Sequence, residues 1–374
     1  MKKIKVATVF SGIGAIEFAL KRMSIDYEIA FACDNGEREI IYDSEEELKK
    51  IKSFKTVREK YKYVEELYSK STRKTNFVKI SYLANYDCPN ERFFQDIKLL
   101  DGTDFANQID LFVGGSPCQS FSLVGNKGGL EDTRGTLFYE FARLVKEIQP
   151  KVFIYENVKN LMNHNNGKTW EIIKEVFESL GYSYKYAVLN SSDYGIPQTR
   201  RRLFVVGFKE KNKYEMPNKF SSLKFKMNDF LENNCYVGGF RYDSKGDIII
   251  ENKCGTVDKK YFLTPKLYAY VMKSGTKNFR QNPIINLDIA RTLLKTMGNR
   301  HRAGIDNYVS IDGSNKLGKV RMLTEREAHR LMGFTDDYKI VVSRSQAYKQ
   351  AGNSIVVDVL IEIVKEIIKT GIFE

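Results

Sequence analysis

The chain of 374 residues is poor in the residues that build metal sites and disulfide frameworks. It contains five cysteines and three histidines, and no two cysteines are spaced as Cys-x-x-Cys. We therefore expect neither a zinc site nor a disulfide framework, and free thiols suit a reducing cytoplasm. No apolar run reaches the length of about 18 residues that a membrane span needs. Met1-Lys2-Lys3 leads directly into a short strand-like segment, so no signal peptide is expected either.

The chain also lacks an excess of negative charge. It has 60 basic against 47 acidic residues, a net charge of +13. Residues 209–320 carry 21 Lys and Arg against 11 Asp and Glu, so most of the excess lies in this one segment. A concentrated basic segment favours a polyanionic partner such as nucleic acid, and a solubilising surface is the plain alternative.

The length exceeds that of one usual hydrophobic core, which predicts two domains. Regular α/β texture covers 1–208 and returns over 321–374, whereas 209–320 has short strand-like pieces. We predict that 1–208 and 321–374 form one discontinuous domain and that 209–320 forms a second. Residues 43–86, with 11 basic and 7 acidic residues, predict a charged helical insertion in the first domain. Covering the sheet edge is favoured over DNA contact as its role.

The amino-terminal segment predicts a strand, a glycine turn and a helix. Residues 4–10 are apolar and β-branched, 11–14 read Ser-Gly-Ile-Gly, and 15–23 have helical spacing. This arrangement gives a nucleotide-type cofactor close backbone contact. A second strand over 27–33 ends at Asp34, which is placed to accept hydrogen bonds from ribose hydroxyls. A turn or N-cap role for Asp34 is the alternative.

A thiol and a carboxylate follow two further strands. The apolar residues 111–113 lead into Gly114-Gly115 and Cys118, and the apolar residues 152–155 lead into Glu156. Parallel strands end at the same edge of a sheet, so both side chains can share one pocket. Taken alone, Cys118 is more often structural, and Glu156 is as often a surface or N-cap residue.

The remaining elements follow the same alternation. We expect a strand over 92–97 with Asp96 near its end, and a mobile glycine-rich loop over 124–135. Three arginines at 200–202 enter a buried strand and need anionic or polar partners. Further helices are expected over 136–148, 170–180, 324–332 and 355–368, and further strands over 182–189 and 203–206.

These motifs together resemble the bacterial DNA (cytosine-5)-methyltransferases of restriction-modification systems. The matching residues occur in the family's order: Phe10-Ser11-Gly12-Ile13-Gly14, Asp34, Asp96, Gly115-Ser116-Pro117-Cys118-Gln119, Arg134-Gly135-Thr136-Leu137, Glu156-Asn157-Val158, Gln198-Thr199-Arg200-Arg201-Arg202, Arg321 with Leu323-Thr324-Glu325-Arg326-Glu327, and Gln350-Ala351-Gly352-Asn353-Ser354. Two departures are the 43–86 insertion, which compact members lack, and Ser11, which stands where alanine is usual.

The resemblance implies an S-adenosylmethionine-dependent, Rossmann-like fold: a mostly parallel sheet with helices on both faces, plus a smaller irregular target-recognition domain. It implies S-adenosyl-L-methionine as cofactor and S-adenosyl-L-homocysteine as product. Phe10 is expected against adenine, Asp34 at the ribose, Asp96 at the adenine amino group, and Asn353 and Ser354 at the methionine end, from the last helix. The full expected cofactor set is Phe10, Gly12, Ile13, Gly14, Asp34, Asp96, Ile97, Asn353 and Ser354.

The resemblance also implies the catalytic roles. The Cys118 thiolate adds to C6 of cytosine, which makes C5 nucleophilic enough to accept a methyl group. Protonated Glu156 is expected to hydrogen-bond N3 of the cytosine, and Arg202 is expected to hold its O2 atom. Arg200 is expected to position the backbone or the cysteine loop. The target base must leave the DNA duplex to be reached. The base that removes the C5 proton is not identified.

Double-stranded DNA is the implied partner, read by the segment 209–320. Ala290-Arg291-Thr292-Leu293 resembles the family's Thr-Leu pair, and Arg300 and Arg302 could touch phosphate or guanine or lie in a solvated loop. The expected DNA-binding residues are Gln119, Arg134, Thr292, Arg300 and Arg302. The resemblance further implies a monomer, associated with the nucleoid in a bacterial cytoplasm. A cognate restriction endonuclease is not required as a binding partner.

Three rival interpretations remain open. An RNA methyltransferase of the family's tRNA branch carries a Cys-Phe-Thr motif in its target region, whereas Cys235 and Cys254 here lie in Asn-Cys-Tyr and Lys-Cys-Gly. A catalytically dead DNA-binding relative is disfavoured by intact Cys118, Glu156 and Arg202. A nicotinamide oxidoreductase is suggested only by the glycine turn. The recognition sequence itself cannot be deduced from the chain.

Overall fold

The computed structural model describes residues 2–117, 137–220, 222–276, 279–280, 283–298, 300–301 and 304–374. Its main feature is a seven-stranded sheet with the order β3-β2-β1-β4-β5-β7-β6. All neighbours pair in parallel except β7, which runs antiparallel to both β5 and β6. The strands are β1 (Ile4–Val9), β2 (Tyr27–Cys33), β3 (Phe93–Phe94), β4 (Leu111–Gly114), β5 (Val152–Val158), β6 (Ser183–Asn190) and β7 (Arg201–Phe208).

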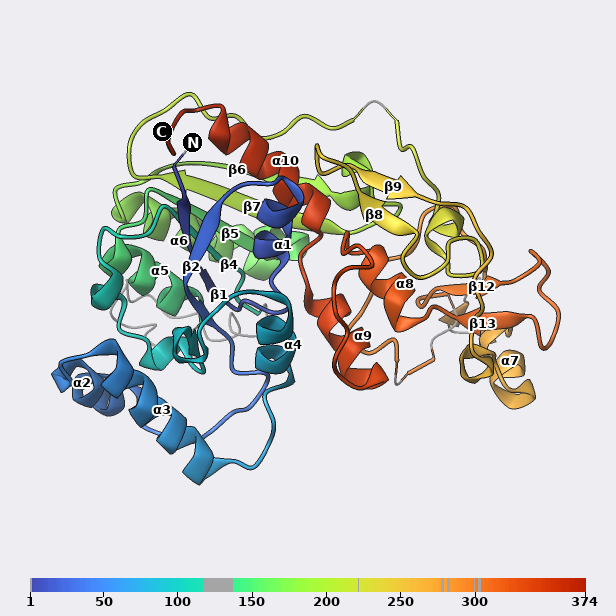
Figure 1. Cartoon of the computed structure of the whole chain (residues 1–374), viewed down its shortest axis with the longest axis horizontal. Coiled ribbons are helices and arrows are strands. Elements are labelled where there is room, and N and C mark those ends of the chain that lie inside the picture. Colours follow the sequence, from blue (N-terminus) through green and yellow to red (C-terminus); the bar gives the residue numbers. More distant parts are fainter. Residues whose placement is uncertain are drawn as a thin grey trace.

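Helices cover both faces of this sheet (Figure 1). Alternate residues of each central strand enter different cores: Val152 packs with α1 and α10, whereas Phe153 packs with α5 and α6. The central strands are continuously apolar because both of their faces are buried. The predicted fold class is confirmed. The helices are α1 (Ala15–Arg22), α2 (Ser44–Ser53), α3 (Val57–Ser71), α4 (Phe77–Asn85), α5 (Leu137–Ile148), α6 (Lys168–Ser179), α7 (Pro265–Val271), α8 (Glu325–Arg330), α9 (Arg344–Asn353) and α10 (Val357–Ile368).

The segment 209–320 contains mostly short antiparallel pairs. They are β8 (Phe240–Tyr242) with β9 (Ile248–Ile250), β10 (Gly275–Thr276) with β11 (Phe279–Arg280), and β12 (Tyr308–Ser310) with β13 (Val320–Met322). A small core of Leu263, Val271, Tyr308 and Val320 lies within this part of the chain. The division into two domains stays a prediction, because the α1–α10 core continues into Phe230, Phe240 and Leu293.

A fully buried arginine joins distant segments at this junction. The Nη1 atom of Arg22 in α1 donates to the Gly333 carbonyl at 2.9 Å, and Nη2 donates to the Gly246 carbonyl at 2.6 Å. Its guanidinium also pairs with Asp358 of α10 at 2.9 Å. The carboxy-terminal helix therefore packs beside the first helix of the sheet domain.

The predicted helical insertion contains three helices, α2, α3 and α4. Ile51 of α2 and Val64 and Tyr68 of α3 form a small core with Leu99 beside the edge strand β3. In Figure 1, α2 and α3 lie at the opposite end of the molecule from β12 and β13, and far from β8 and β9. The third helix, α4, belongs to the main core through Tyr82. The insertion thus covers an otherwise exposed sheet edge.

Two predicted elements are longer than those in the structure, and one helix was not predicted. The strand expected over 92–97 is reduced to β3, because the Asp96 side chain caps a 3-10 turn by accepting from the Lys98 amide at 3.0 Å. The helix expected over 324–332 is shorter, since Thr324 is an N-cap with a capping box to Glu327. Helix α9 was not expected, because its polar sequence has little apolar periodicity.

Candidate active site

A cavity of about 310 Å³ opens at the carboxyl ends of β1, β2 and β5. Residues expected from the sequence to bind cofactor or cytosine meet there, although they come from widely separated parts of the chain. Those that line it are Phe10, Gly12, Asp34, Glu156, Arg200, Arg202 and Asn353. Phe77 and Val78 at the start of α4 also line it, and the sequence pattern gave no signal for them.

The turn after β1 has an unusual backbone. Phe10 has φ 52°, a left-handed conformation that costs a residue other than glycine about 1–3 kcal/mol. Gly14 has φ 75°, and a Cβ atom there would lie 2.2 Å from the Tyr86 ring. The Tyr86 hydroxyl in turn donates to the Gly14 carbonyl at 2.6 Å and to the Ile13 carbonyl at 3.0 Å. Ile13 and Gly14 therefore shape the turn from below and do not line the cavity.

Asp34 holds this turn against the end of β2. Its Oδ2 accepts from the Gly12 amide at 3.0 Å, and its Oδ1 accepts from the Gly36 amide at 2.8 Å. Burial raises the pKa of Asp34, and these two backbone donors oppose the shift. A carboxylate offers about four acceptor directions, so one on each oxygen remains for a ligand. Two hydroxyl donors, such as those of a ribose, would fit these two free acceptor directions.

The opposite wall carries Glu156 and Arg202. These residues lie on the antiparallel pair β5–β7, and the Arg202 Nε atom is 3.1 Å from Glu156 Oε1. Burial raises the pKa of Glu156, while Arg202 and Arg200 lower it. A Cβ atom on Gly115, directly after β4, would lie 2.8 Å from Glu156 Oε2, so a side chain there would displace this carboxyl group.

Arg200 lines the cavity, and its guanidinium nitrogens donate to backbone carbonyls. Its Nη1 donates to Leu293 at 3.0 Å, and its Nη2 donates to Gly352 at 2.9 Å and to Ser354 at 2.8 Å. Burial lowers the pKa of Arg200 to about 9, with the nearby Arg202 charge acting in the same direction. Arg200 thus links the end of α9 to the segment 209–320.

Asn353 and Ser354 lie at the end of α9 and not on the last helix, which corrects the expected placement. Asn353 lines the main cavity. Ser354 borders an adjoining recess of about 60 Å³, which Phe10, Gly12 and Glu156 also line. The Gly-Asn-Ser motif ends one helix, and the next begins at Val357.

Asp96 and Ile97 lie outside the cavity lining. Ile97 is buried in the core under α5, and its carbonyl accepts from Arg143 Nη2 at 2.9 Å. The Asp96 carboxylate accepts hydrogen bonds from the hydroxyls of Tyr42, directly before the insertion, and Tyr68, within it. The two tyrosines were not expected, since nothing in the sequence links them to Asp96.

Cys118, Gln119, Arg134, Arg302 and the expected loop 124–135 lie outside the described residues. The chain is described up to Pro117, which lines the cavity with Gly115 and Ser116. Asn157 Nδ2 donates to the Ser116 carbonyl at 2.9 Å, and Ser116 Oγ shares a hydrogen bond of 2.7 Å with the Tyr155 hydroxyl. Asn157 is therefore a positioning residue that the sequence reasoning missed, although it directly follows Glu156.

The expected DNA-reading residues are only partly brought to the site. The Thr292 hydroxyl donates to the Thr199 carbonyl at 2.5 Å, and the Leu293 amide donates to Gln198 Oε1 at 3.0 Å. The Thr-Leu pair therefore docks on the arginine motif. Arg300 is exposed and does not line the cavity.

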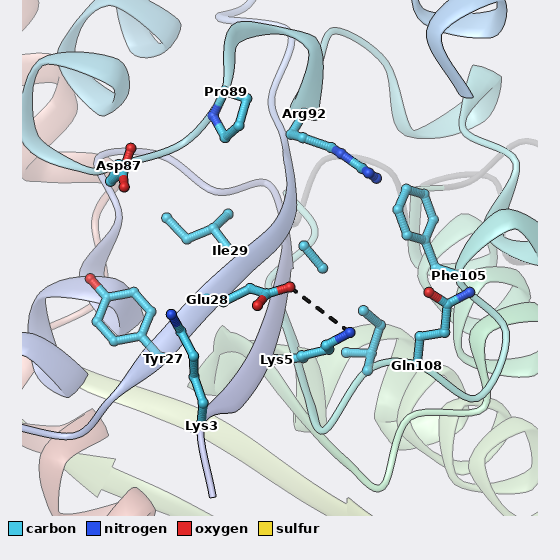
Figure 2. Close-up of a pocket in the computed structure, with 12 residues that line it drawn as sticks. Lys3, Lys5, Tyr27, Glu28, Ile29, Asp87, Pro89, Arg92, Phe105 and Gln108 are labelled. Atoms are coloured by element: carbon cyan, nitrogen blue, oxygen red, sulfur yellow. Dashed lines mark ion pairs between the residues drawn. The ribbon is translucent and has the colours of Figure 1, made fainter. Parts of the chain in front are cut away.

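A second hollow of about 490 Å³ lies at the other end of the sheet. Figure 2 shows Lys5, Tyr27 and Glu28 around it, near the amino ends of β1 and β2. The Lys5 Nζ and Glu28 Oε1 atoms are 3.9 Å apart. None of the expected site residues lines it, and parallel sheets place their chemistry at the carboxyl ends of the strands.

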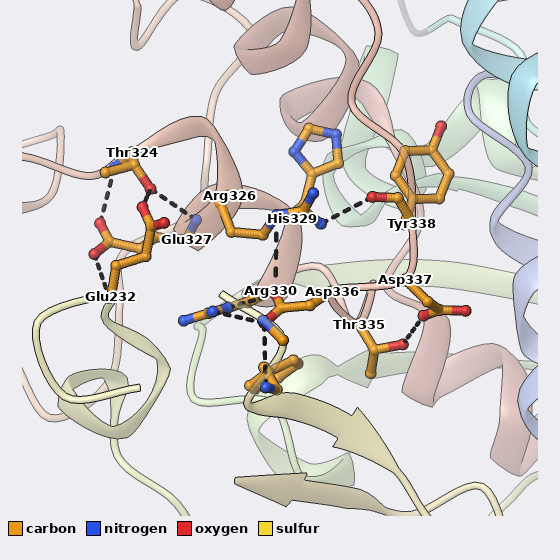
Figure 3. Close-up of polar contacts among 12 residues, drawn as sticks. Glu232, Thr324, Arg326, Glu327, His329, Arg330, Thr335, Asp336, Asp337 and Tyr338 are labelled. Atoms are coloured by element: carbon orange, nitrogen blue, oxygen red, sulfur yellow. Dashed lines mark hydrogen bonds and ion pairs between the residues drawn. The ribbon is translucent and has the colours of Figure 1, made fainter. Parts of the chain in front are cut away.

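The residues in and around α8 form buried polar contacts with other parts of the chain. Arg330 pairs with Asp336 at 2.8 Å and donates to the Phe230 carbonyl at 3.0 Å (Figure 3). Thr324 donates to Glu232 Oε2 at 2.5 Å in the same network. These groups need partners because they are desolvated, so this motif fixes the 228–240 segment on α8.

Two further findings concern the described residues. They contain no group of three or more His, Cys, Asp or Glu side chains arranged to hold a metal ion. None of the helices within those ranges is long and apolar enough to cross a membrane.

The fold and the cavity at its carboxyl edge are those of a Rossmann-like methyltransferase. A model of the family "C-5 cytosine-specific DNA methylase" matches residues 4–369. The chain therefore belongs to the C-5 cytosine-specific DNA methylases and is a DNA (cytosine-5)-methyltransferase. This confirms the resemblance inferred from the motifs.

Similar proteins agree with this assignment. Type II methyltransferase M.SsoII of Shigella sonnei is 36% identical over 307 residues, covering 79% of this chain and 72% of that protein. Type II methyltransferase M.HhaI of Haemophilus parahaemolyticus is 38% identical over 254 residues, covering 67% of this chain and 73% of that protein. The solved structure of S. pombe Dnmt2 methyltransferase shares the fold with a TM-score of 0.65 and 17% identity, covering 98% of this chain and 99% of that one.

Proposed function

We propose that the protein transfers a methyl group from S-adenosyl-L-methionine to C5 of a cytosine flipped out of duplex DNA. The observation that carries this proposal is the shared cavity of about 310 Å³, which joins Asp34 to Glu156 and Arg202. The first of these residues suits a ribose, and the other two suit the polar edge of a pyrimidine. Family membership supports the same reaction.

The cofactor end is proposed to consist of Phe10, Gly12, Asp34, Asn353 and Ser354. Phe10 lies against adenine, Asp34 accepts the ribose hydroxyls, and the end of α9 holds the methionine part. When bound, S-adenosylmethionine supplies an electrophilic methyl group. We also propose that Ile13, Gly14, Asp96 and Ile97 shape or complete this end, although they lie outside the cavity lining.

The cytosine end is proposed to work through covalent addition. Cys118 adds as thiolate to C6, while protonated Glu156 hydrogen-bonds N3 and relieves the charge that develops on the ring. C5 thereby becomes nucleophilic and would form the new bond to the methyl carbon, whose bond to the sulfonium sulfur would break to leave S-adenosyl-L-homocysteine. Loss of the C5 proton to a base then breaks the bond between Cys118 and C6. Arg202 holds O2, and Arg200 positions the surrounding backbone.

The segment 209–320 is proposed to form the target-recognition domain, with 1–208 and 321–374 as the catalytic domain. Thr292, Arg300 and Arg302, together with Gln119 and Arg134, are the proposed DNA contacts. The protein is proposed to act as a monomer on bacterial DNA in the cytoplasm, as the modification enzyme of a restriction-modification system. Its similarity to type II methyltransferases supports this setting.

Labelled methyl transfer to duplex DNA and to tRNA tests the proposal. DNA should accept the label, and Cys118→Ser should abolish transfer while cofactor binding persists, because a hydroxyl is a much weaker nucleophile at neutral pH. Cys254→Ser, at an exposed thiol, is the matched control and should keep full activity. DNA containing 5-fluorocytosine should trap a covalent complex only when Cys118 is present.

Residual Cys118→Ser turnover within tenfold of wild type contradicts the covalent mechanism, and transfer to tRNA alone favours the RNA-methylating alternative. Bisulfite sequencing of a host that expresses the protein then identifies the methylated cytosine and its sequence context.

A further inference from the structure

Tyr42, directly before the insertion, and Tyr68, within it, bring their hydroxyls to one carboxylate oxygen of Asp96 at the proposed cofactor edge. Tyr42, just before α2, donates to Asp96 Oδ2 at 2.6 Å. Tyr68, within α3, donates to the same oxygen at 2.7 Å. The other oxygen, Oδ1, accepts from the Lys98 amide at 3.0 Å. Three donors therefore fix the orientation of the Asp96 carboxylate.

The two phenols are built to remain donors. Tyr68 is 2% exposed and packs in the small core of α2 and α3. The Arg38 guanidinium lies 4.9 Å from the centre of its ring. Burial, followed by the Asp96 charge, raises the pKa of both Tyr42 and Tyr68. Both hydroxyls thus keep their protons across the physiological range.

Asp96 stands beside the ribose-binding carboxylate. Strand β3 pairs in parallel with β2, and the Asp34 amide donates to the Phe94 carbonyl at 3.1 Å. Burial first, and then the charges of Asp96 and Asp34, raise the pKa of the Cys33 thiol, so both carboxylates approach this one side chain. The two acids therefore lie at neighbouring points of the same sheet edge.

A carboxylate has about four acceptor directions, and three of those of Asp96 are taken. Within the described ranges no further donor reaches it, which leaves one direction on Oδ1. The exocyclic amino group of adenine carries N–H donors that suit this direction.

We propose that Tyr42 and Tyr68 are positioning residues that hold Asp96 so that Oδ1 accepts the adenine amino group of S-adenosylmethionine. The inference rests on the proposed function and gives the insertion a part in cofactor recognition. It also explains why a helical segment placed on a sheet edge sends two phenols to one acid.

The test compares two ligands across conservative variants. S-adenosylhomocysteine has the amino group, and its N6,N6-dimethyl analogue lacks both N–H donors. Equilibrium binding of each is measured on the full-length wild type, on Tyr42→Phe, on Tyr68→Phe and on the double variant. Tyr63→Phe is the matched control, because Tyr63 also lies in α3 but donates to Glu47 instead. Circular dichroism melts establish that each variant folds.

Loss of the two hydroxyls should weaken the binding of S-adenosylhomocysteine about tenfold and leave the binding of the analogue within twofold of wild type. It should also raise KM for S-adenosylmethionine, with kcat within threefold of wild type. Tyr63→Phe should match wild type. Equal weakening of both ligands, or weakening of neither, overturns the inference while leaving the proposed function intact. A wild type that binds neither S-adenosylhomocysteine nor S-adenosylmethionine overturns the proposed function itself. Tyr42 lies outside any helix, so its single variant decides the matter if the double variant does not fold.

Discussion

Arg202 and Glu156 form an ion pair across the antiparallel strands β7 and β5, with the Arg202 Nε atom 3.1 Å from Glu156 Oε1. Both side chains are mostly buried, at 17% and 15% exposed. Two opposing effects act on the protonation of Glu156 in this pair. Burial favours the protonated acid that can hydrogen-bond N3, and the guanidinium favours the carboxylate.

This relationship predicts the pH dependence of the single-turnover rate. The rate should fall on the alkaline side as Glu156, whose pKa is raised, loses its proton. Arg202→Gln removes a cation that lowers this pKa, so the alkaline limb should move to higher pH, whereas Arg202→Lys should keep its position. Glu156→Gln should lower the rate by about 10²–10⁴-fold and remove the limb. An alkaline limb that persists in Glu156→Gln assigns it to another group.

Two glycines of the first turn should differ in their tolerance of a side chain. Gly12→Ala meets only the Phe10 carbonyl, at 3.9 Å, so its cost is the left-handed backbone, about 1–2 kcal/mol. Gly14→Ala adds a contact of 2.2 Å with Tyr86, and overpacking adds about 1–3 kcal/mol. Chemical unfolding of each variant measures the difference. Gly181→Ala is the control, since its φ is 76° and nothing lies within 4 Å. Equal losses of unfolding free energy for Gly14→Ala and Gly181→Ala would contradict the predicted clash between a side chain at position 14 and Tyr86.

A buried acid beneath the same turn should make stability depend on pH. Glu17 in α1 accepts from the Tyr82 hydroxyl at 2.6 Å and from Thr8 at 3.1 Å, and its Oε2 has no partner in the described part of the chain. Burial raises its pKa to about 7 from 4.5. The protonated form is therefore favoured on folding. The stability it contributes is complete below pH 4.5 and is lost as pH rises from 4.5 to about 7.

The loss corresponds to at most about 3.5 kcal/mol, at about 1.4 kcal/mol for each pKa unit. Urea unfolding of wild type at pH 5, 6, 7 and 8 should show this decline, and Glu17→Gln should flatten it. Glu210→Gln, at an exposed acid, should retain the wild-type slope. A steep decline that survives in Glu17→Gln places the titration elsewhere.

The insertion should contribute little to DNA affinity. Lys52 pairs with Glu147 at 2.9 Å, and the Lys50 Nζ atom lies 4.6 Å from the centre of the Tyr63 ring. Helices α2 and α3 lie far from β8, β9, β12 and β13 (Figure 1). Changing Lys49, Lys50, Lys52 and Lys55 together to Gln should leave the salt dependence of binding unchanged.

The matched change in the target segment replaces Lys259, Lys260, Lys266 and Lys273 with Gln. It should reduce the slope of log affinity against log salt by about one for each lysine that contacts a phosphate. A reduction of two or more in the insertion variant would instead make α2 and α3 part of the DNA-binding surface.

The sequence by itself determined the chemistry and the fold class of this protein. Asp34 and Glu156 were recognisable because each follows an apolar strand, and parallel strands bring their carboxyl ends to one edge. The glycine turn was recognisable because Gly12 and Gly14 directly follow an apolar, β-branched strand and precede a helical pattern. These are consequences of local pattern and backbone geometry.

The tertiary structure decided the partners that meet through space. Helix α9 has little apolar periodicity, so its contribution of Asn353 to the cavity followed only from the packed structure. The two tyrosines on Asp96 lie 54 and 28 residues from it in the chain. Judged from the sequence, Arg200 could have faced a phosphate. In the structure its guanidinium instead donates to backbone carbonyls of two distant segments. Such contacts depend on long-range packing, and residue spacing carries no record of them.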